Sequence, residues 1–188
     1  MTMATLEHPQ WVAAAVAVTL GFWAVGAYHR LVGLRGAVSS TFLQVDDLLR
    51  QRHATGQALL DTLGPVLASE QSTLDAVALA LQQVQMAASM ARPRPCLAEP
   101  VNQLSAAESA LASALGRLLA LIDAHTEELL VARNDVTPLV NELRGLDAKL
   151  TVAKHVFNDA GRHYNQAVEQ FPTHLLTRVF RFGKTGQL

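Results

Sequence analysis

The sequence has little of what several fold classes require. Its 188 residues include one cysteine, so no disulfide can form within the chain and a disulfide scaffold is excluded. Aromatic residues make up 5% and charged residues 16% of the chain, and the formal net charge is −1. A chain so near neutrality has no overall field that attracts nucleic acid, and we expect no nucleic-acid partner. Apolar residues, with Ala and Leu in excess, make up 50%, which favours helices packed on helices.

One long uncharged run lies near the amino terminus. Residues 11–28 carry no charge, and Thr19 is the one clearly polar side chain among them. As a helix, the run would cover about 27 Å, close to the ~30 Å hydrocarbon core of a bilayer. Trp11, Trp23 and Tyr28 lie at or near its ends, where amphipathic rings favour the membrane interface. We therefore expect a tail over residues 1–10, a transmembrane helix over 11–28 and a helical domain over 29–188, with a lipid bilayer as partner.

The charges that flank this run predict its orientation. Arg30 and Arg35 follow it directly, and no Lys or Arg precedes it. The positive-inside rule then places the carboxyl-terminal domain in the cytoplasm. Two other interpretations stay open: a signal peptide with a small-residue cleavage site near the end of the run, and a buried core helix. Within the run, Ala13, Ala17 and Gly21 recur every four residues, a pattern that either lets helices associate in lipid or arises by chance in an Ala-rich segment.

Helix-breaking residues divide positions 29–188 into four segments. They stand at residues 64–65, 93–100, 134–138 and 172. Between them, apolar residues recur at intervals of three and four, which is typical of amphipathic helices and not of strands. We predict an all-α fold in which the transmembrane helix is continuous with an antiparallel four-helix bundle of long helices, packed like a coiled coil and followed by a short carboxyl-terminal helix. The expected core of the first and last segments comprises Leu31, Leu34, Val38, Phe42, Val45, Leu49, Leu59, Leu63, Leu139, Val140, Leu143, Leu146, Leu150, Ala153, Phe157, Ala160, Tyr164, Ala167 and Phe171.

Local signals predict how the helices begin. Between residues 28 and 34 the one break is Gly33, which a helix tolerates at a cost of about 1 kcal/mol. The membrane helix is therefore expected to run on into the first bundle helix and to couple lipid rigidly to the bundle. Thr137 can cap a helix whose first residue is Pro138. The segment Ser105–Glu108 has the form of a capping box, and it fits equally well inside a helix that has already begun.

Three blocks of the sequence resemble the LemA family of bacterial membrane proteins. The first reads YHRLVGLR at 28–35 and VDDLLRQR at 45–52, and the second reads LGRLLAL at 115–121. The third reads FNDA at 157–160 and YNQAVEQFP at 164–172, followed by FRF. The order and spacing of these blocks fit the family over nearly the whole chain. The family motifs place candidate interaction residues at Asp46, Arg50, Arg52, Asn158, Tyr164, Asn165, Phe171, Pro172, Phe180 and Phe182.

The resemblance implies a single-pass protein of the bacterial inner membrane with a bundle of long helices. It implies no established catalytic activity and no cofactor. The chain departs from the family pattern at residues 54–60, where the usual Asp-Leu-Ile-Pro-Asn-Leu-Val stretch is missing, and at His29, where the family has Asn. We therefore do not expect this chain to share with other family members a partner that binds at those positions.

Few side chains point to catalysis or metal binding. Asp159, His155 and His163 share one helix face, which is more typical of solvated histidines around a salt-bridging carboxylate than of a metal site, and we assign no metal. Cys96 lies in a proline-rich loop, where we expect it to be exposed and either reactive or incidental. The sequence contains neither a phosphate-binding glycine loop nor a nucleophile elbow. We predict no cofactor and no small-molecule substrate.

Two polar pairs are more informative. Asp46 and Arg50 have the spacing of a helical ion pair, on a face that is either solvated or a charged docking strip. Asn158 and Asn165 lie seven residues apart on the flank of the last helix, and they are either ordinary surface or a bridge to a neighbouring helix or subunit. Beyond Pro172, apolar residues with basic neighbours either pack across the bundle end or lie in a membrane interface.

These features lead to one expected function and two rivals. We expect a non-enzymatic, membrane-anchored helical bundle that acts as a scaffold or adaptor, either as a homo-oligomer or with other membrane proteins. The first rival is a signal-transducing receptor, whose continuous first helix would transmit a stimulus and which would need a ligand pocket. The second rival is an enzyme that uses Asp159 and its histidine neighbours.

Overall fold

The computed structural model describes residues 8–125, 133–170 and 183–188. These residues form the α helices α1 (His8–Leu63), α2 (Gln71–Ala91), α3 (Ala98–Ala124) and α4 (Arg133–Glu169), with a 3-10 turn, η1 (Ala68–Glu70), before α2. No strand occurs within those three ranges, so the all-α prediction is confirmed. The short carboxyl-terminal helix was expected over residues that lie mostly outside the described part, and residues 183–188 are not helical.

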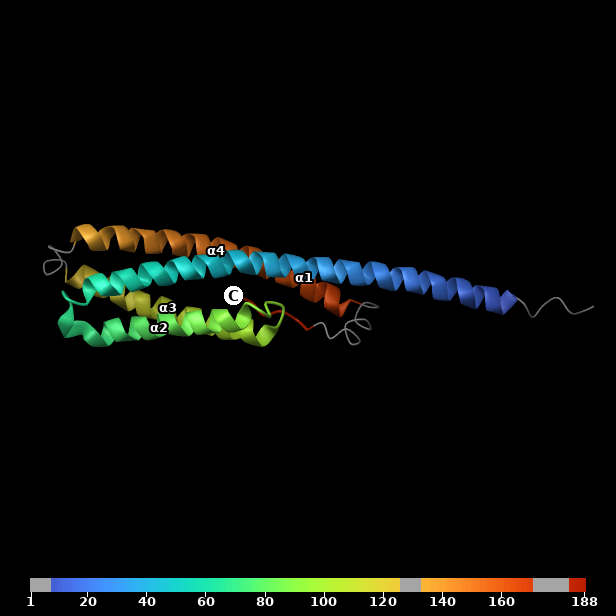
Figure 1. Cartoon of the computed structure of the whole chain (residues 1–188), viewed down its shortest axis with the longest axis horizontal. Coiled ribbons are helices and arrows are strands. Elements are labelled where there is room, and N and C mark those ends of the chain that lie inside the picture. The colour runs from blue at the N-terminus through green and yellow to red at the C-terminus, as the bar shows by residue number, and fades with distance from the viewer. Residues whose placement is uncertain (1–7, 126–132, 171–182) are drawn as a thin grey trace, which may run out of the picture.

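The helices lie lengthwise against one another in two main pairs. In Figure 1, α1 runs beside α4 and α2 runs beside α3, and successive helices alternate in direction along the long axis. The two pairs meet where the second half of α1 contacts α2. The first part of α1 projects past the ends of the other three helices. One helix thus belongs both to the packed body of the protein and to an isolated projection.

The packed body is stabilised by contacts between the apolar helix faces that the spacing of residues predicts. All the expected core residues of the first and last segments that the structure describes are buried or, for Leu34, Leu139 and Ala160, partly buried. Phe42 of α1 and Phe157 of α4 meet edge to face, with ring centroids 5.8 Å apart. Burying one side chain of this size contributes about 1.5–3 kcal/mol relative to leaving it in water. The α1–α4 contact is therefore a main source of stability.

The first helix is continuous from His8 to Leu63, as expected from the lack of a strong break near Gly33. Two of the described helices are long and apolar enough to cross a membrane by length and composition. In α3, 28% of the most apolar window is buried, whereas in α1 none of it is. Trp11 and Phe22, for example, are 75% and 77% exposed. The structure therefore contradicts the interpretation of residues 11–28 as a buried core helix.

The helix boundaries confirm one prediction and correct another. α1 ends at Leu63, immediately before the Gly-Pro pair that was expected to end it. The expected break at residues 134–138 is wrong, because α4 begins at Arg133 and contains Pro138. Pro138 is the sixth residue of α4, so it cannot donate the hydrogen bond that its position would make to the carbonyl of Asn134, and this loss falls near the start of the helix. Thr137 consequently lies inside α4 and does not cap it, and Ser105 lies inside α3.

Candidate functional site

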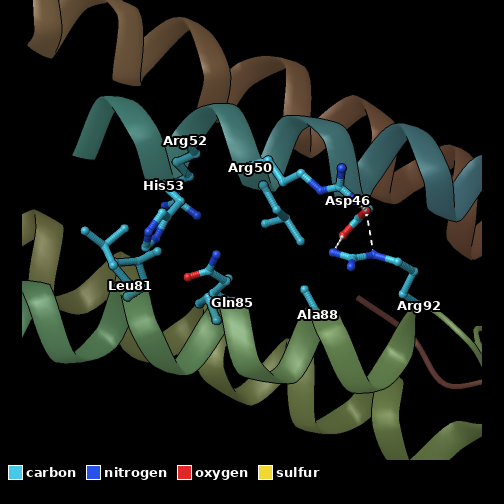
Figure 2. A pocket seen from close by; sticks show the side chains of 11 residues that line it. Asp46, Arg50, Arg52, His53, Leu81, Gln85, Ala88 and Arg92 are labelled. Atoms are coloured by element: carbon cyan, nitrogen blue, oxygen red, sulfur yellow. Dashed lines mark hydrogen bonds and ion pairs between the residues drawn. The ribbon is translucent and has the colours of Figure 1, made fainter. Parts of the chain in front are cut away.

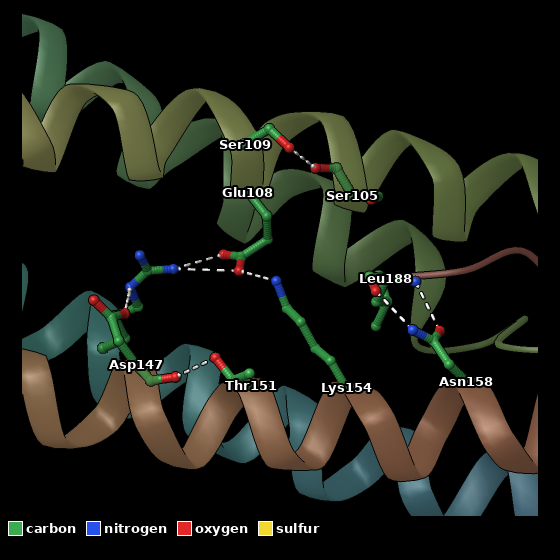
Figure 3. Close-up of polar contacts among 9 residues, drawn as sticks. Ser105, Glu108, Ser109, Asp147, Thr151, Lys154, Asn158 and Leu188 are labelled. Atoms are coloured by element: carbon green, nitrogen blue, oxygen red, sulfur yellow. Dashed lines mark hydrogen bonds and ion pairs between the residues drawn. The ribbon is translucent and has the colours of Figure 1, made fainter.

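A cluster of charged side chains lies inside the packed helices. Arg52 of α1 donates from Nη1 to both carboxylate oxygens of Glu108 of α3, at 3.0 and 3.2 Å. Lys154 of α4 donates to Glu108 Oε2 at 2.7 Å, and Arg52 Nε lies 2.9 Å from Oδ1 of Asp147, also on α4. Arg52 and Glu108 are each 4% exposed. Figure 3 shows how this charged cluster joins three helices.

The charged cluster is electrically balanced, with two cations against two carboxylates. Burial raises the pKa of the Asp147 carboxyl above its ordinary value, and the nearby Arg52 cation opposes this shift. A buried ion pair adds little net stability, because desolvation offsets the attraction. Removing one partner is costly, since the other charge then stays buried without compensation. The cluster therefore fixes which faces of α1, α3 and α4 meet.

A second charged group centres on Asp46 of α1, six residues before Arg52. Asp46 is 2% exposed and accepts hydrogen bonds from Arg50 at 2.6 Å and from Arg92, just past the end of α2. Arg92 binds both carboxylate oxygens, with Nε at 3.0 Å and Nη2 at 2.9 Å. The hydrogen bond to Asp46 raises the pKa of the Arg92 guanidinium. The Asp46–Arg50 pair is confirmed, and of the two interpretations of its face the solvated one is wrong for Asp46, which is buried against another helix.

A cavity of about 370 Å³ lies between α1 and α2, with Asp46 and Arg92 on one side and Arg52 and His53 on the other (Figure 2). Its polar lining comprises Asp46, Arg50, Arg52, His53, Gln85 and Arg92, and its apolar lining comprises Leu49, Leu81, Val84, Ala88 and Leu111. His53 Nδ1 is buried and has no hydrogen-bond partner in the structure. Apolar walls with an excess of cations suit a small molecule that has an apolar body and an anionic group.

The two asparagines of the last helix bind the carboxyl-terminal segment of the chain. Asn165 donates to the carbonyl of Thr185 at 3.0 Å and accepts from its N–H at 2.9 Å. Asn158 does the same with Leu188, at 2.8 and 2.9 Å, as Figure 3 shows. These amides are therefore not ordinary surface. The bridge expected to a neighbouring helix or subunit is instead a bridge to residues 183–188 of the same chain.

The loop between α2 and α3 packs against α4 and the middle of α1. Cys96 is 7% exposed, which corrects the expectation of an exposed thiol, and its Sγ lies 3.8 Å from the carbonyl of Arg35. Burial raises the pKa of the Cys96 thiol and raises the pKa of Tyr164 to about 12. A cavity of about 270 Å³ lies beside both side chains. A thiol that is buried and protonated is a poor nucleophile.

The remaining candidate residues lie on the surface or outside the described part. Trp11, Trp23, Tyr28, Arg30 and Arg35 are exposed. Phe171, Pro172, Phe180 and Phe182 lie outside the residues that the structure describes.

The histidine-rich face of α4 holds no assembled metal site. His155, Asp159 and His163 are exposed, and Asp159 forms an ion pair with Arg162. Across residues 8–125, 133–170 and 183–188, no group of three or more His, Cys, Asp or Glu side chains could hold a metal ion.

Sequence reasoning missed Glu108, Asp147, Lys154 and Arg92. One signal was available for Glu108, which follows Leu104 and precedes Leu111 at core spacing in α3. Arg52 occupies a comparable position three residues after the buried Leu49. Charged residues at seam positions of two helices indicate that the helices meet through a buried ion pair. The sequence alone could not show which carboxylate faces which cation.

Comparison with known proteins gives a family for the chain. The match to the LemA family covers residues 41–188 and thus includes both charged groups and the asparagines that bind the carboxyl-terminal segment. A comparison with curated proteins found no match. The resemblance is therefore confirmed by a match over most of the chain, which includes every quoted block except residues 28–35, and the protein belongs to the LemA family.

Proposed function

We propose that this protein is a non-enzymatic, single-pass scaffold or adaptor of the bacterial inner membrane. In this proposal, residues 11–28 cross the bilayer and residues 29–188 form an antiparallel four-helix bundle in the cytoplasm. The bundle associates with further copies or with other membrane proteins. The observation that carries the proposal is α1, whose apolar first part projects past the other helices with none of its most apolar window buried, while its second part builds the core.

The exposed part of α1 supports a membrane location on energetic grounds. Its large apolar side chains include Trp11, Val12, Val16, Val18, Leu20, Phe22 and Val25, all more than half exposed. Each Å² of apolar surface kept in water costs about 25 cal/mol, so a helix of this kind needs lipid or another apolar surface around it. Arg30 and Arg35, directly after the run, favour the cytoplasmic side.

Charge substitutions in the run test the anchoring. We expect the double substitution Val16→Arg and Leu20→Arg to move the full chain from the carbonate-resistant membrane fraction to the soluble fraction. Each arginine at the middle of a span costs about 2.5–3.5 kcal/mol on insertion. Leu79→Arg is the matched control, because Leu79 is about as exposed as Leu20 but lies on α2. A wild-type chain that is soluble in carbonate, or whose mature form lacks residues 11–28, would contradict the anchor.

Cross-linking in cells tests the scaffold role. We expect full-length chains to cross-link to one another or to other membrane proteins, and the products to disappear when the anchor carries the two arginines. Protease added to spheroplasts should leave the bundle intact, since we place it in the cytoplasm. A chain that stays strictly monomeric in membranes and captures no membrane protein would refute the role.

The cavity between α1 and α2 favours a second candidate, a receptor that transmits a stimulus along α1. A receptor needs a ligand pocket, and this cavity of about 370 Å³ is lined by the helix that would carry the signal. A ligand can shift a conformational equilibrium only by its difference in affinity for the two states. The test is whether a small amphiphilic anion changes the distance between spin labels on α1 and α2. A distance unaffected by saturating ligand would exclude this candidate.

A further inference from the structure

Two asparagines of α4 bind the carboxyl-terminal segment Gly183–Leu188 through its main-chain groups. Asn165 binds the N–H and carbonyl of Thr185, and Asn158 binds those of Leu188. Seven residues of α helix advance about 10.5 Å, and three residues of extended chain advance about 10 Å. The spacing of the two amides on α4 thus matches the spacing of two main-chain positions in an extended peptide. Such a pair forms a clamp that does not depend on the side chains it holds, and we call it the amide clamp.

Side-chain selectivity comes from the residues between and around the clamp. Thr185 is 5% exposed and donates from Oγ1 to the carbonyl of Pro95 at 2.7 Å. A Cβ atom on Gly186 would lie 2.3 Å from Oδ1 of Asn102 and 2.8 Å from the carbonyl of Ala98, both on α3. Any residue larger than glycine would therefore push the segment away from α3.

The other two positions complete the pattern. Gln187 is exposed, so its side chain is not selected. Leu188 is partly buried and packs against the core. On the side of α4, Gly161 provides the space, since a Cβ there would lie 2.8 Å from Cγ2 of Thr185. The groove between α3 and α4 therefore selects a small hydroxyl residue, a glycine, any residue and a leucine, in that order.

We propose that this groove is a peptide-binding site for the motif Thr-Gly-x-Leu, and that its occupant in assembled protein is the segment Gly183–Leu188 of a second copy. A second copy carries the one sequence that the structure already shows to fit. Exchange replaces contacts within a chain by identical contacts between chains, so it costs no hydrogen bond. Anchoring in one membrane, which rests on the proposed function, holds the grooves of neighbouring copies at the same height and raises the local concentration of segments.

Peptide binding tests the site. Gly186→Val in the full chain displaces the segment and leaves the groove vacant, and the probe is a synthetic peptide of residues 183–188. We expect saturable binding to this variant, and no binding of a peptide with Ala at position 186. Adding Asn158→Ala and Asn165→Ala removes four hydrogen bonds, which predicts a Kd weaker by about 30-fold or more. Absence of binding to the vacant groove, or a Kd unchanged by the asparagine substitutions, would overturn the site.

Folding and side-chain controls accompany this test. Gln187→Val is the matched control, because it adds the same bulk at an exposed position of the segment, and we expect it to leave the groove occupied and closed to the peptide. Each variant is checked by its thermal unfolding. If Gly186→Val does not fold, Leu188→Pro is used in its place. Proline has no N–H to donate to Asn158 Oδ1, so we expect this substitution to vacate the groove as well.

Complementation in membranes tests the exchange between copies. One full-length copy carries Gly186→Val and keeps its groove, and the other carries Asn158→Ala with Asn165→Ala and keeps its segment. We expect neither copy to capture its own kind, and the mixture to regain capture through one exchanged segment. If wild-type copies associate and the mixture does not, the exchange is wrong while the proposed function stands. If wild-type copies never associate, the exchange fails and the scaffold proposal is left to stand on capture of other membrane proteins. Peptide binding to the vacant groove would still support the binding site.

Discussion

Glu108 is the residue whose substitution most directly probes the charged cluster. It accepts hydrogen bonds from Arg52 of α1 and Lys154 of α4, and its side chain is 5% exposed. Glu108→Gln keeps the size and shape of the side chain and removes its charge. Arg52, also 5% exposed, would then be left with Asp147, whose side chain is 47% exposed.

The structure sets the expected magnitude of the effect. Breaking a buried ion pair by removing one partner costs about 3–5 kcal/mol. Because Asp147 still compensates Arg52 in part, we expect the lower end, a loss of about 3 kcal/mol in the free energy of unfolding. For a chain of this length, such a loss lowers Tm by about 6–12 °C. It is a large share of the roughly 5–15 kcal/mol that stabilises a typical domain.

The assay is urea unfolding of the full chain in detergent micelles, followed by far-ultraviolet circular dichroism. Asp159→Asn is the matched control, because it removes a carboxylate from an exposed ion pair on α4 and should cost less than about 1 kcal/mol. The double variant Arg52→Met with Glu108→Leu replaces the pair by apolar side chains of similar size. It should lose less stability than Glu108→Gln alone, since the two charges that it leaves, on Asp147 and Lys154, are opposite in sign and partly exposed, whereas Glu108→Gln leaves the buried Arg52 cation.

Two outcomes would refute this reasoning. If Glu108→Gln costs less than about 1 kcal/mol, water or a side-chain shift compensates Arg52 and the cluster does not fix the helix faces. If the double variant is less stable than Glu108→Gln, the ion pair contributes net attraction, contrary to the desolvation argument.

Three further predictions follow from the core. Phe42→Ala should lower the free energy of unfolding by about 3–5 kcal/mol, because it removes the ring that packs on Phe157 and leaves a cavity, as urea unfolding would show. The pKa of Tyr164 is raised to about 12 by burial, so its contribution to stability is present below about pH 10 and is lost as the pH rises toward 12. The unfolding free energy of Tyr164→Phe should therefore fall less over that interval, by about 2–3 kcal/mol, and parallel curves would contradict the assignment. Cys96 should react with iodoacetamide at least about tenfold more slowly in folded than in urea-unfolded protein, because burial removes access and raises the pKa of the thiol; equal rates would show that it is exposed.

The amino-acid sequence by itself determined the helices and their buried faces. Apolar residues at intervals of three and four place Val38, Phe42, Phe157 and Tyr164 in the core, and the structure buries all four. The continuity of α1 could be predicted as well, because helix formation is local and one glycine is a weak break. The start of α4 could not be predicted, since a proline near a helix start fits either the first helical position or the inside of a helix that has already begun, and the local sequence does not distinguish the two.

The tertiary structure decided which polar groups meet. Spacing along one helix pairs Asp46 with Arg50, but only the packing of α2 on α1 adds Arg92 and buries the carboxylate. Glu108 is 56 residues from Arg52 in the sequence, and Asn165 is 20 residues from Thr185. Local periodicity contains no information about such distant pairs, because they depend on how whole helices are rotated and shifted against one another. The sequence thus determined the helices and their apolar faces. The tertiary structure determined which charged residues are buried together and formed the groove between α3 and α4 that holds residues 183–188.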